Sequence, residues 1–136
     1  MAITNAFKVA ELIRHLQYDS TNDVITTSKR TADKNAKRAD TQRTATTVFS
    51  LDTFAHASFR AARYIVAMSK GTDYHSTEIM LIHDGTNVTL TQYGTLKSTS
   101  LATFDADISG SDVRLRCTPA SATATNIQYD RTVVDA

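Results

Sequence analysis

The chain has 136 residues, of which 41% are apolar and 21% charged, and its formal net charge is +1. This length supports one domain with a short extra segment, and a charge so near neutrality gives no general attraction to nucleic acid or to an anionic membrane. The single cysteine, Cys117, excludes an internal disulfide framework and a zinc site built from cysteines. No apolar run reaches the roughly 18 residues that span a bilayer and no signal-peptide pattern is present, so we expect no membrane partner.

Residues 4–18 have the pattern of an amphipathic helix. Apolar side chains recur at spacings of three and four residues, which places them along one face. A helix this short is marginal in water and needs a surface to dock on. The candidate docking residues of this helix are Phe7, Val9, Leu12, Ile13 and Leu16.

Residues 19–46 are polar and basic. Six basic residues stand against two acidic ones between Ser28 and Arg43, a local balance of +4. We expect an extended arm, with a polar helix over residues 30–42 as one conformation on docking. The segment suits a solvated linker, an arm that docks on an acidic protein surface or a nucleic-acid arm, but no aromatic residue between Lys29 and Arg43 could stack on bases. The candidate docking residues are Lys29, Arg30, Lys34, Lys37, Arg38 and Arg43.

After residue 46 the chain consists of short runs rich in Val, Ile, Thr and Tyr, several of which alternate apolar with polar residues. Asp84-Gly85 is a strong hairpin signal between two of these runs. The spacing predicts an antiparallel β-sandwich, jelly-roll-like, over residues 47–136, behind an N-terminal docking segment over residues 1–46. The expected strands lie at residues 47–54, 63–69, 77–83, 87–93, 112–117 and 126–134.

Residues 103–117 resemble a calcium-binding loop, because Asp105, Asp107 and Ser109 take its first, third and fifth places. An EF-hand loop needs a bidentate Glu at the twelfth place and flanking helices, whereas Arg116 stands there and the flanks have strand patterns. We therefore interpret the stretch as a strand, a turn and a second strand. A weak calcium site remains an alternative, as does a carboxylate pair about 6–7 Å apart on one strand face, a spacing that suits glycoside hydrolysis with inversion.

The other candidates for chemistry are isolated. His75 and His83 lie eight residues apart with Glu78 between them, and His15 and His56 lie elsewhere. A metal or catalytic site needs several such groups to converge. Cys117 lies in the middle of an expected strand, where cysteine behaves as a small apolar residue. We expect no catalytic residues, no metal and no cofactor.

A set of short motifs resembles a β-domain that recurs in tailed-bacteriophage virion proteins, especially those of marine cyanophages. The resemblance covers residues 47–134 and specifies a fold rather than an activity. The matching residues are Arg63 to Val66, Glu78, His83 to Thr86, Tyr93-Gly94, Thr103 to Gly110, Arg114-Leu115 and Arg131-Thr132.

The resemblance implies a non-enzymatic structural protein of a phage virion, assembled in the bacterial host cytoplasm. We expect a tail or neck fibre or appendage component, anchored through its N-terminal helix and arm. Its partners would be other virion proteins of the neck, tail or capsid, and the chain itself a homo-oligomer, trimeric or higher. A nucleic-acid partner is not expected. The alternatives are a capsid decoration or cement protein, and a glycan- or receptor-binding fibre tip that uses Tyr74, Tyr93 and Tyr129.

Overall fold

The computed structural model describes residues 16–19, 24–27 and 36–136. The chain divides into two units, residues 1–34 and 35–136. In the first unit, β1 (Leu16–Asp19) pairs antiparallel with β2 (Val24–Thr27). The helix predicted over residues 4–18 is therefore wrong for its last turn, where Leu16 and its neighbours pair with a β-branched strand that favours extended backbone. Residues 4–15 of that helix lie outside the described residues.

The second unit consists of eight strands joined by short turns. Every strand predicted from the sequence overlaps one of them, and the predicted stretch around Asp105 supplies a further one. The strands are β3 (Ala36–Arg43), β4 (Phe49–Ala55), β5 (Phe59–Lys70), β6 (Asp73–His83), β7 (Val88–Lys97), β8 (Ala102–Ser109), β9 (Asp112–Pro119) and β10 (Thr125–Asp135).

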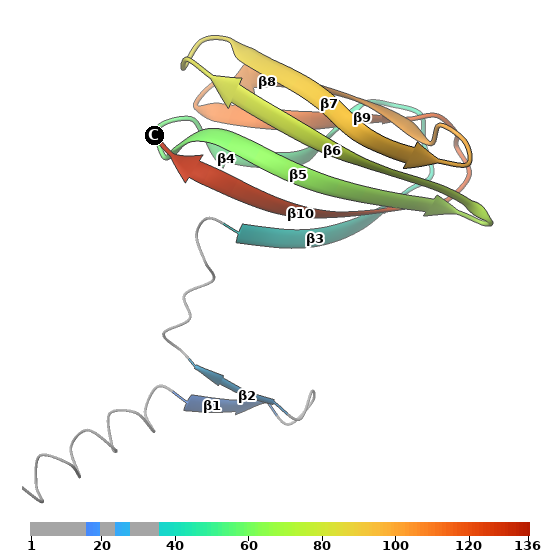
Figure 1. Cartoon of the computed structure of the whole chain (residues 1–136), viewed down its shortest axis with the longest axis horizontal. Coiled ribbons are helices and arrows are strands. Elements are labelled where there is room, and N and C mark those ends of the chain that lie inside the picture. The colour runs from blue at the N-terminus through green and yellow to red at the C-terminus, as the bar shows by residue number, and fades with distance from the viewer. Residues whose placement is uncertain (1–15, 20–23, 28–35) are drawn as a thin grey trace, which may run out of the picture. The chain divides into compact units, whose positions relative to one another are not determined.

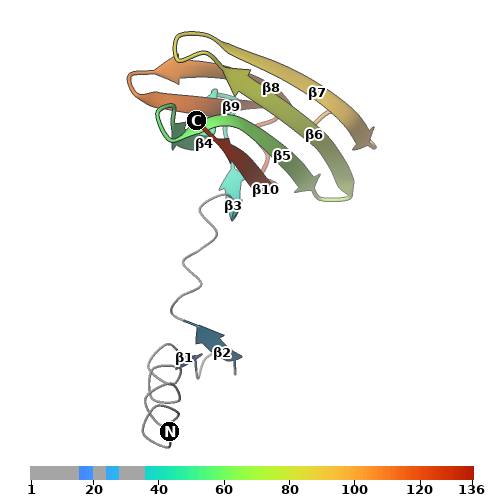
Figure 2. The same ribbon diagram turned by 60° about the vertical axis from the view of Figure 1, so that its left-hand side comes forward.

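The strands form two antiparallel sheets stacked as a sandwich (Figures 1 and 2). One sheet has five strands in the order β3-β10-β5-β6-β7, and the other has three in the order β4-β9-β8. The mainly β, antiparallel prediction is confirmed. A jelly roll is built from two Greek keys. The jelly-roll expectation is wrong for the middle of the chain, because β5, β6 and β7 are consecutive neighbours in one sheet and form a meander.

The most N-terminal strand of the sandwich lies in the segment that the sequence pattern assigned to the arm. β3 pairs along its whole length with β10, from Ala36 opposite Thr132 to Arg43 opposite Thr125. The polar helix considered for residues 30–42 is therefore wrong over this range. Extended backbone is favoured over a helix here because β10 would otherwise present an unpaired edge. Pairing satisfies the backbone hydrogen-bonding groups of both strands.

The core lies between the sheets and follows from the period-two alternation of the strands. Tyr64 and Val66 of β5 and Ile79 of β6 are fully buried from the five-stranded sheet. Val113 and Leu115 of β9 meet them from the three-stranded sheet, also fully buried. Each such side chain contributes about 1.5–3 kcal/mol of apolar transfer free energy, which makes this interior the main source of stability.

The predicted hairpin between β6 and β7 is present and is built by Asp84 and Gly85. Gly85 has φ +96°, which an L side chain rarely adopts. The Asp84 carboxylate accepts hydrogen bonds from the backbone N–H groups of Asn87 at 2.6 Å and Thr86 at 2.8 Å. These bonds stabilise the ionised form and lower the pKa of Asp84 to about 2.

Candidate functional site

The carboxylates of residues 103–117 are held by arginines of the neighbouring strand. Arg114 Nε donates to Asp107 Oδ1 at 2.7 Å, and Arg116 reaches Asp105 Oδ1 at 2.5 Å and Asp107 Oδ2 at 3.2 Å. The predicted strand, turn and strand are confirmed, since β8 ends at Ser109 and β9 begins at Asp112. The hydrogen bond from Arg114 lowers the pKa of Asp107, whereas a general acid of a glycosidase needs a raised pKa.

His75 and His83 do not come together in the sandwich, whereas His56 packs edge-to-face against His83 with 6.2 Å between the ring centroids. His75 and His83 are both buried on the inner side of β6, about 27 Å apart along the strand. His83 Nδ1 accepts from Gly85 N at 3.1 Å and its Nε2 lies 2.6 Å from Phe59 O, which ties the β6–β7 turn to β5. Burial lowers the pKa of His75. His15 lies outside the described residues.

Within residues 36–136 and the two short strands, no three His, Cys, Asp or Glu side chains are grouped as a metal site. Cys117 faces the core from β9, and burial raises the pKa of its thiol to about 12. A thiol in that state is a poor nucleophile and a poor ligand. Among those same residues no helix has the length and apolar character that crossing a bilayer requires.

A buried carboxylate between the sheets is a feature that the sequence pattern did not reveal. Asp52 projects from β4 toward the five-stranded sheet, and its side chain is fully buried. Its Oδ1 accepts from Lys37 Nζ at 2.6 Å and from Tyr129 OH at 2.9 Å. Its Oδ2 accepts from Arg131 Nη1 at 2.9 Å and from Tyr64 OH at 3.1 Å. The cluster links β4 to β3, β5 and β10.

The electrostatics of this cluster indicate a structural role. Burial acts to raise the pKa of Asp52, but the hydrogen bond from Lys37 and the charge of Arg131 outweigh it and the pKa is lowered. Burial raises the pKa values of Tyr64 and Tyr129, so both phenols stay protonated donors. With every carboxylate oxygen occupied and no exposed surface, Asp52 cannot meet a substrate.

The outer face of the five-stranded sheet is the strongest candidate for an interaction site. Seven large apolar side chains are exposed on it, and we call them the apolar face. Leu96 is 71% exposed, Val134 63% and Tyr74 60%. The apolar face comprises Ile65, Tyr74, Met80, Ile82, Tyr93, Leu96 and Val134.

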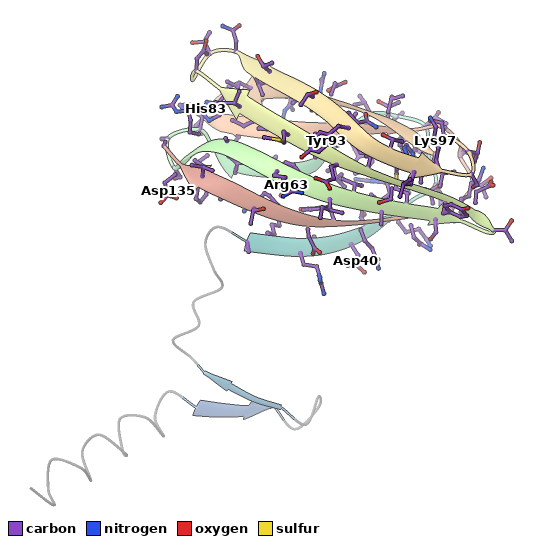
Figure 3. All side chains as sticks on the ribbon, viewed as in Figure 1. Asp40, Arg63, His83, Tyr93, Lys97 and Asp135 are labelled. Carbon is purple, nitrogen blue, oxygen red and sulfur yellow. The ribbon has the colours of Figure 1, made fainter. Side chains whose placement is uncertain are left out.

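Strand register brings these side chains together. Val134 of β10 lies opposite Ala61, which lies opposite Ile82 of β6. Ile65 lies opposite Glu78, which lies opposite Tyr93 of β7. The face is therefore a patch that crosses four strands, and Figure 3 labels one of its members, Tyr93, and the neighbouring Arg63.

One ion pair lies within the apolar face. Arg63 Nε donates to Glu78 Oε2 at 3.0 Å, and a second guanidinium nitrogen reaches the same oxygen at 2.5 Å. The hydrogen bond from Arg63 lowers the pKa of Glu78, and a further hydrogen bond with Tyr93 acts in the same direction. Because the two charges neutralise each other, the patch presents no net charge to a partner.

A shallow groove lies beside the apolar face, along β10. Its central depression has a volume of about 580 Å³ and continues at both ends into smaller ones. The rims are formed by paired side chains of β3 and β10, with Arg38 donating to Asp130 at 2.8 Å and Gln42 to Asn126 at 2.8 Å. Ile65 and Ala67 of β5 line the other side.

The predicted docking residues differ in where they lie and what they contact. Lys37 points inward to Asp52, Arg38 points outward to Asp130, and the guanidinium of Arg43 stacks 3.7 Å over the Phe49 ring. Lys37 and Arg43 are thus engaged within the sandwich, whereas the Arg38 side chain is 84% exposed beside Asp130. A docking role for these residues stays a prediction. Leu16 lies in β1. The others lie outside the described residues: Phe7, Val9, Leu12, Ile13, Lys29, Arg30 and Lys34.

The comparisons with known proteins give structural matches and no sequence match. No protein-family model and no curated protein matches the chain. Among solved structures, the tailspike protein of Acinetobacter baumannii phage AM24 matches 74% of the chain at 9% identity and a TM-score of 0.47. The tailspike protein of Acinetobacter phage vB_ApiP_P1 matches 75% at 20% identity and 0.43.

A third match is the tailspike protein gp49 of A. baumannii bacteriophage Fri1, described as a capsular polysaccharide depolymerase, over 74% of the chain at 14% identity and a TM-score of 0.30. The matched regions span 26%, 22% and 20% of the three tailspike chains. The chain is thus similar, over most of its own length, to about a quarter or less of each of these bacteriophage tail proteins.

Proposed function

We propose that the chain is a non-enzymatic structural protein of a bacteriophage virion, a component of a tail or neck appendage that assembles through one face of its sandwich. The observation that carries the proposal is the apolar face of the five-stranded sheet. The resemblance of the chain's sequence motifs to phage virion modules also supports the proposal. That the N-terminal segment anchors the chain stays a prediction.

The size of the apolar face supports an assembly surface. Large side chains offer about 150–250 Å² each when fully exposed. At exposures of 39% to 71%, the seven together present roughly 700 Å² of mostly apolar area, above the 300–600 Å² of the largest patch on a usual monomer. That value is close to the roughly 800 Å² that each partner buries in a standard protein interface.

The proposal is tested in two steps. Mass spectrometry and immunogold microscopy of purified virions should find the chain on the tail or neck, and its absence from clean particles would overturn the proposal. Co-purification with the other virion proteins of the same phage should then be weakened at least tenfold by Ile82→Lys. The matched control Thr103→Lys, exposed on β8 of the other sheet, should leave binding unchanged.

A second candidate function is binding of a receptor glycan, and the groove along β10 favours it. Amide, carboxylate and guanidinium groups at its rims are suited to bidentate hydrogen bonds with sugar hydroxyls. Of the three tyrosines considered from the sequence, Tyr74 and Tyr93 are exposed, whereas Tyr129 is buried and cannot stack on a sugar. A glycan array probed with the full chain would decide this, and Gln128→Ala should abolish a signal that arises in the groove.

The absence of catalysis is part of the proposal. An activity like that in the name of the Fri1 tailspike would require an acid and a base, and the carboxylates of β8 are ion-paired with arginines. We expect no release of reducing ends from capsular polysaccharide by the purified chain. Release that Asp107→Asn abolishes would refute the non-enzymatic assignment.

A further inference from the structure

The four sheet edges of the sandwich are protected to very different degrees. β3 and β7 border the five-stranded sheet, and β4 and β8 border the three-stranded sheet. An edge strand presents unpaired backbone groups that can pair with another chain, and natural proteins block this with charges and bulges. The degree of protection at each edge therefore indicates where pairing between chains is permitted.

Three of the edges have such protection. Half of the eight residues of β3 are charged, with Lys37, Arg38, Asp40 and Arg43 along the edge. β8 has two carboxylates, Asp105 and Asp107, within eight residues. β4 contains a register shift between Ser50 and Asp52, which bends the strand locally.

The edge at β7 lacks this protection over most of its length. Its nine residues from Val88 to Leu96 include no charged side chain. The register with β6 shifts only beyond Tyr93, where Gly94 has φ +59°, so the six residues Val88–Tyr93 form a regular strand. This segment is about 20 Å long, consists largely of residues with high strand propensity, and its far side pairs with no strand of the described residues.

We propose that β7 pairs antiparallel with β7 of a second copy of this chain, about a two-fold axis at Thr91, and joins two five-stranded sheets into one. This goes beyond the proposed function, because it names a partner and a pairing that hold wherever the chain sits in a particle. Thr91 then lies opposite Thr91 of the second copy, and Thr89 opposite Tyr93 of the second copy. Both pairs are uncharged, and β-branched residues pair favourably with one another and with aromatics across strands.

The position of the apolar face also favours a second copy of this chain as the partner. Thr89, Thr91 and Tyr93 lie on the outer side of β7, directly beside Ile82, Met80 and Glu78 of β6. Pairing of two β7 strands would bring the two apolar faces side by side as one continuous surface. Charge also favours a second copy, since Arg63 and Glu78 are already paired and no like charges meet across the axis.

The test is sedimentation velocity on the full chain over about 10–300 µM, a range suited to a small interface. We expect the wild type to shift to a dimer with rising concentration. Thr91→Lys should abolish the shift, because two lysines would lie opposite each other. Thr132→Lys is the matched control, an exposed threonine of the same sheet on β10, and should dimerise like the wild type.

Hydrogen exchange on the wild type gives a readout that does not depend on a variant. Amides of Val88–Tyr93 should gain protection as concentration rises, while those of β3 should not. A wild type that stays monomeric, a trimer in place of a dimer, or association that persists in Thr91→Lys would each overturn the proposal. A positive result with no chain in purified virions would instead refute the proposed function and leave the pairing intact.

Discussion

Replacing Asp52 by asparagine should be the most destabilising conservative substitution in the sandwich. The carboxylate accepts four hydrogen bonds, from Lys37, Arg131, Tyr64 and Tyr129, at 2.6–3.1 Å. Asparagine keeps the size but removes the charge, and its NH₂ group would face donors. The Arg131 side chain, only 8% exposed, would lose its counter-ion in the interior.

The size of the effect follows from this burial. Removing one partner of a buried ion pair costs about 3–5 kcal/mol, because the remaining charge stays desolvated. Such a loss is about a fifth or more of the roughly 5–15 kcal/mol that stabilises a typical domain. For a body of about 100 residues, each kcal/mol shifts the melting temperature by about 4–8 °C, so Asp52→Asn should lower it by at least about 12 °C.

Urea unfolding followed by far-ultraviolet circular dichroism would measure the change, with tyrosine fluorescence as a second probe, since the chain has five tyrosines and no tryptophan. Asp107→Asn is the matched control. It removes a carboxylate that also pairs with an arginine but is 29% exposed, and it should cost less than about 1 kcal/mol. Equal losses in the two variants would refute the view that Asp52 is an ionised link between the sheets.

Three further expectations follow from the buried and strained positions. The folded-state pKa of Asp52 lies below its ordinary 3.8. The ionised carboxylate therefore stabilises the fold above about pH 4, and this contribution is lost as pH falls through the folded-state pKa. Between pH 7 and pH 3 the unfolding free energy of Asp52→Asn should consequently fall less than that of the wild type. Cys117, with a pKa of about 12 and no exposed surface, should resist a thiol reagent at pH 8 until urea unfolds the chain, and rapid labelling of the native protein would contradict its burial. Gly85→Ala should lower the unfolding free energy by about 1–2 kcal/mol in urea, because φ is positive at this residue while no atom lies within 4 Å of the added carbon. Gly85→Asn should lower it less. Equal stability of the wild type and the two variants would exclude this backbone strain.

Most strands could be predicted from the sequence because their alternation reflects burial directly. In β9, Val113, Leu115 and Cys117 are fully buried while Arg114 and Arg116 face outward. β3 gave no such signal, since its inward side begins with Lys37, a residue typical of a solvated arm. The partner that binds the Lys37 ammonium is the buried carboxylate of Asp52, fifteen residues away on the other sheet. Local periodicity cannot reveal a polar pair formed between two layers.

The apolar face could be predicted only in part. The run Ile79 to Ile82 is apolar at four successive positions, which indicates a strand with apolar residues on both sides, and Met80 and Ile82 are indeed exposed. Leu96 offered no such signal, because it is an isolated apolar residue near the end of a strand, and Val134 forms only a pair with Val133 at the end of another. Their membership of one patch depends on the strand order and register, which bring β10 and β7 to the same sheet.

The two outer faces of the sandwich differ in how their polar groups are used, and this difference argues for contact through the five-stranded sheet. On the three-stranded sheet, Asp105 and Asp107 are bound by Arg114 and Arg116, so a partner would have to break ion pairs or leave them in place. The five-stranded sheet carries the apolar face beside its own ion pairs, and water leaves the apolar side chains at a gain of about 25 cal/mol per Å². A partner that covers this sheet therefore gains free energy by dehydration, whereas one that covers the other sheet gains little.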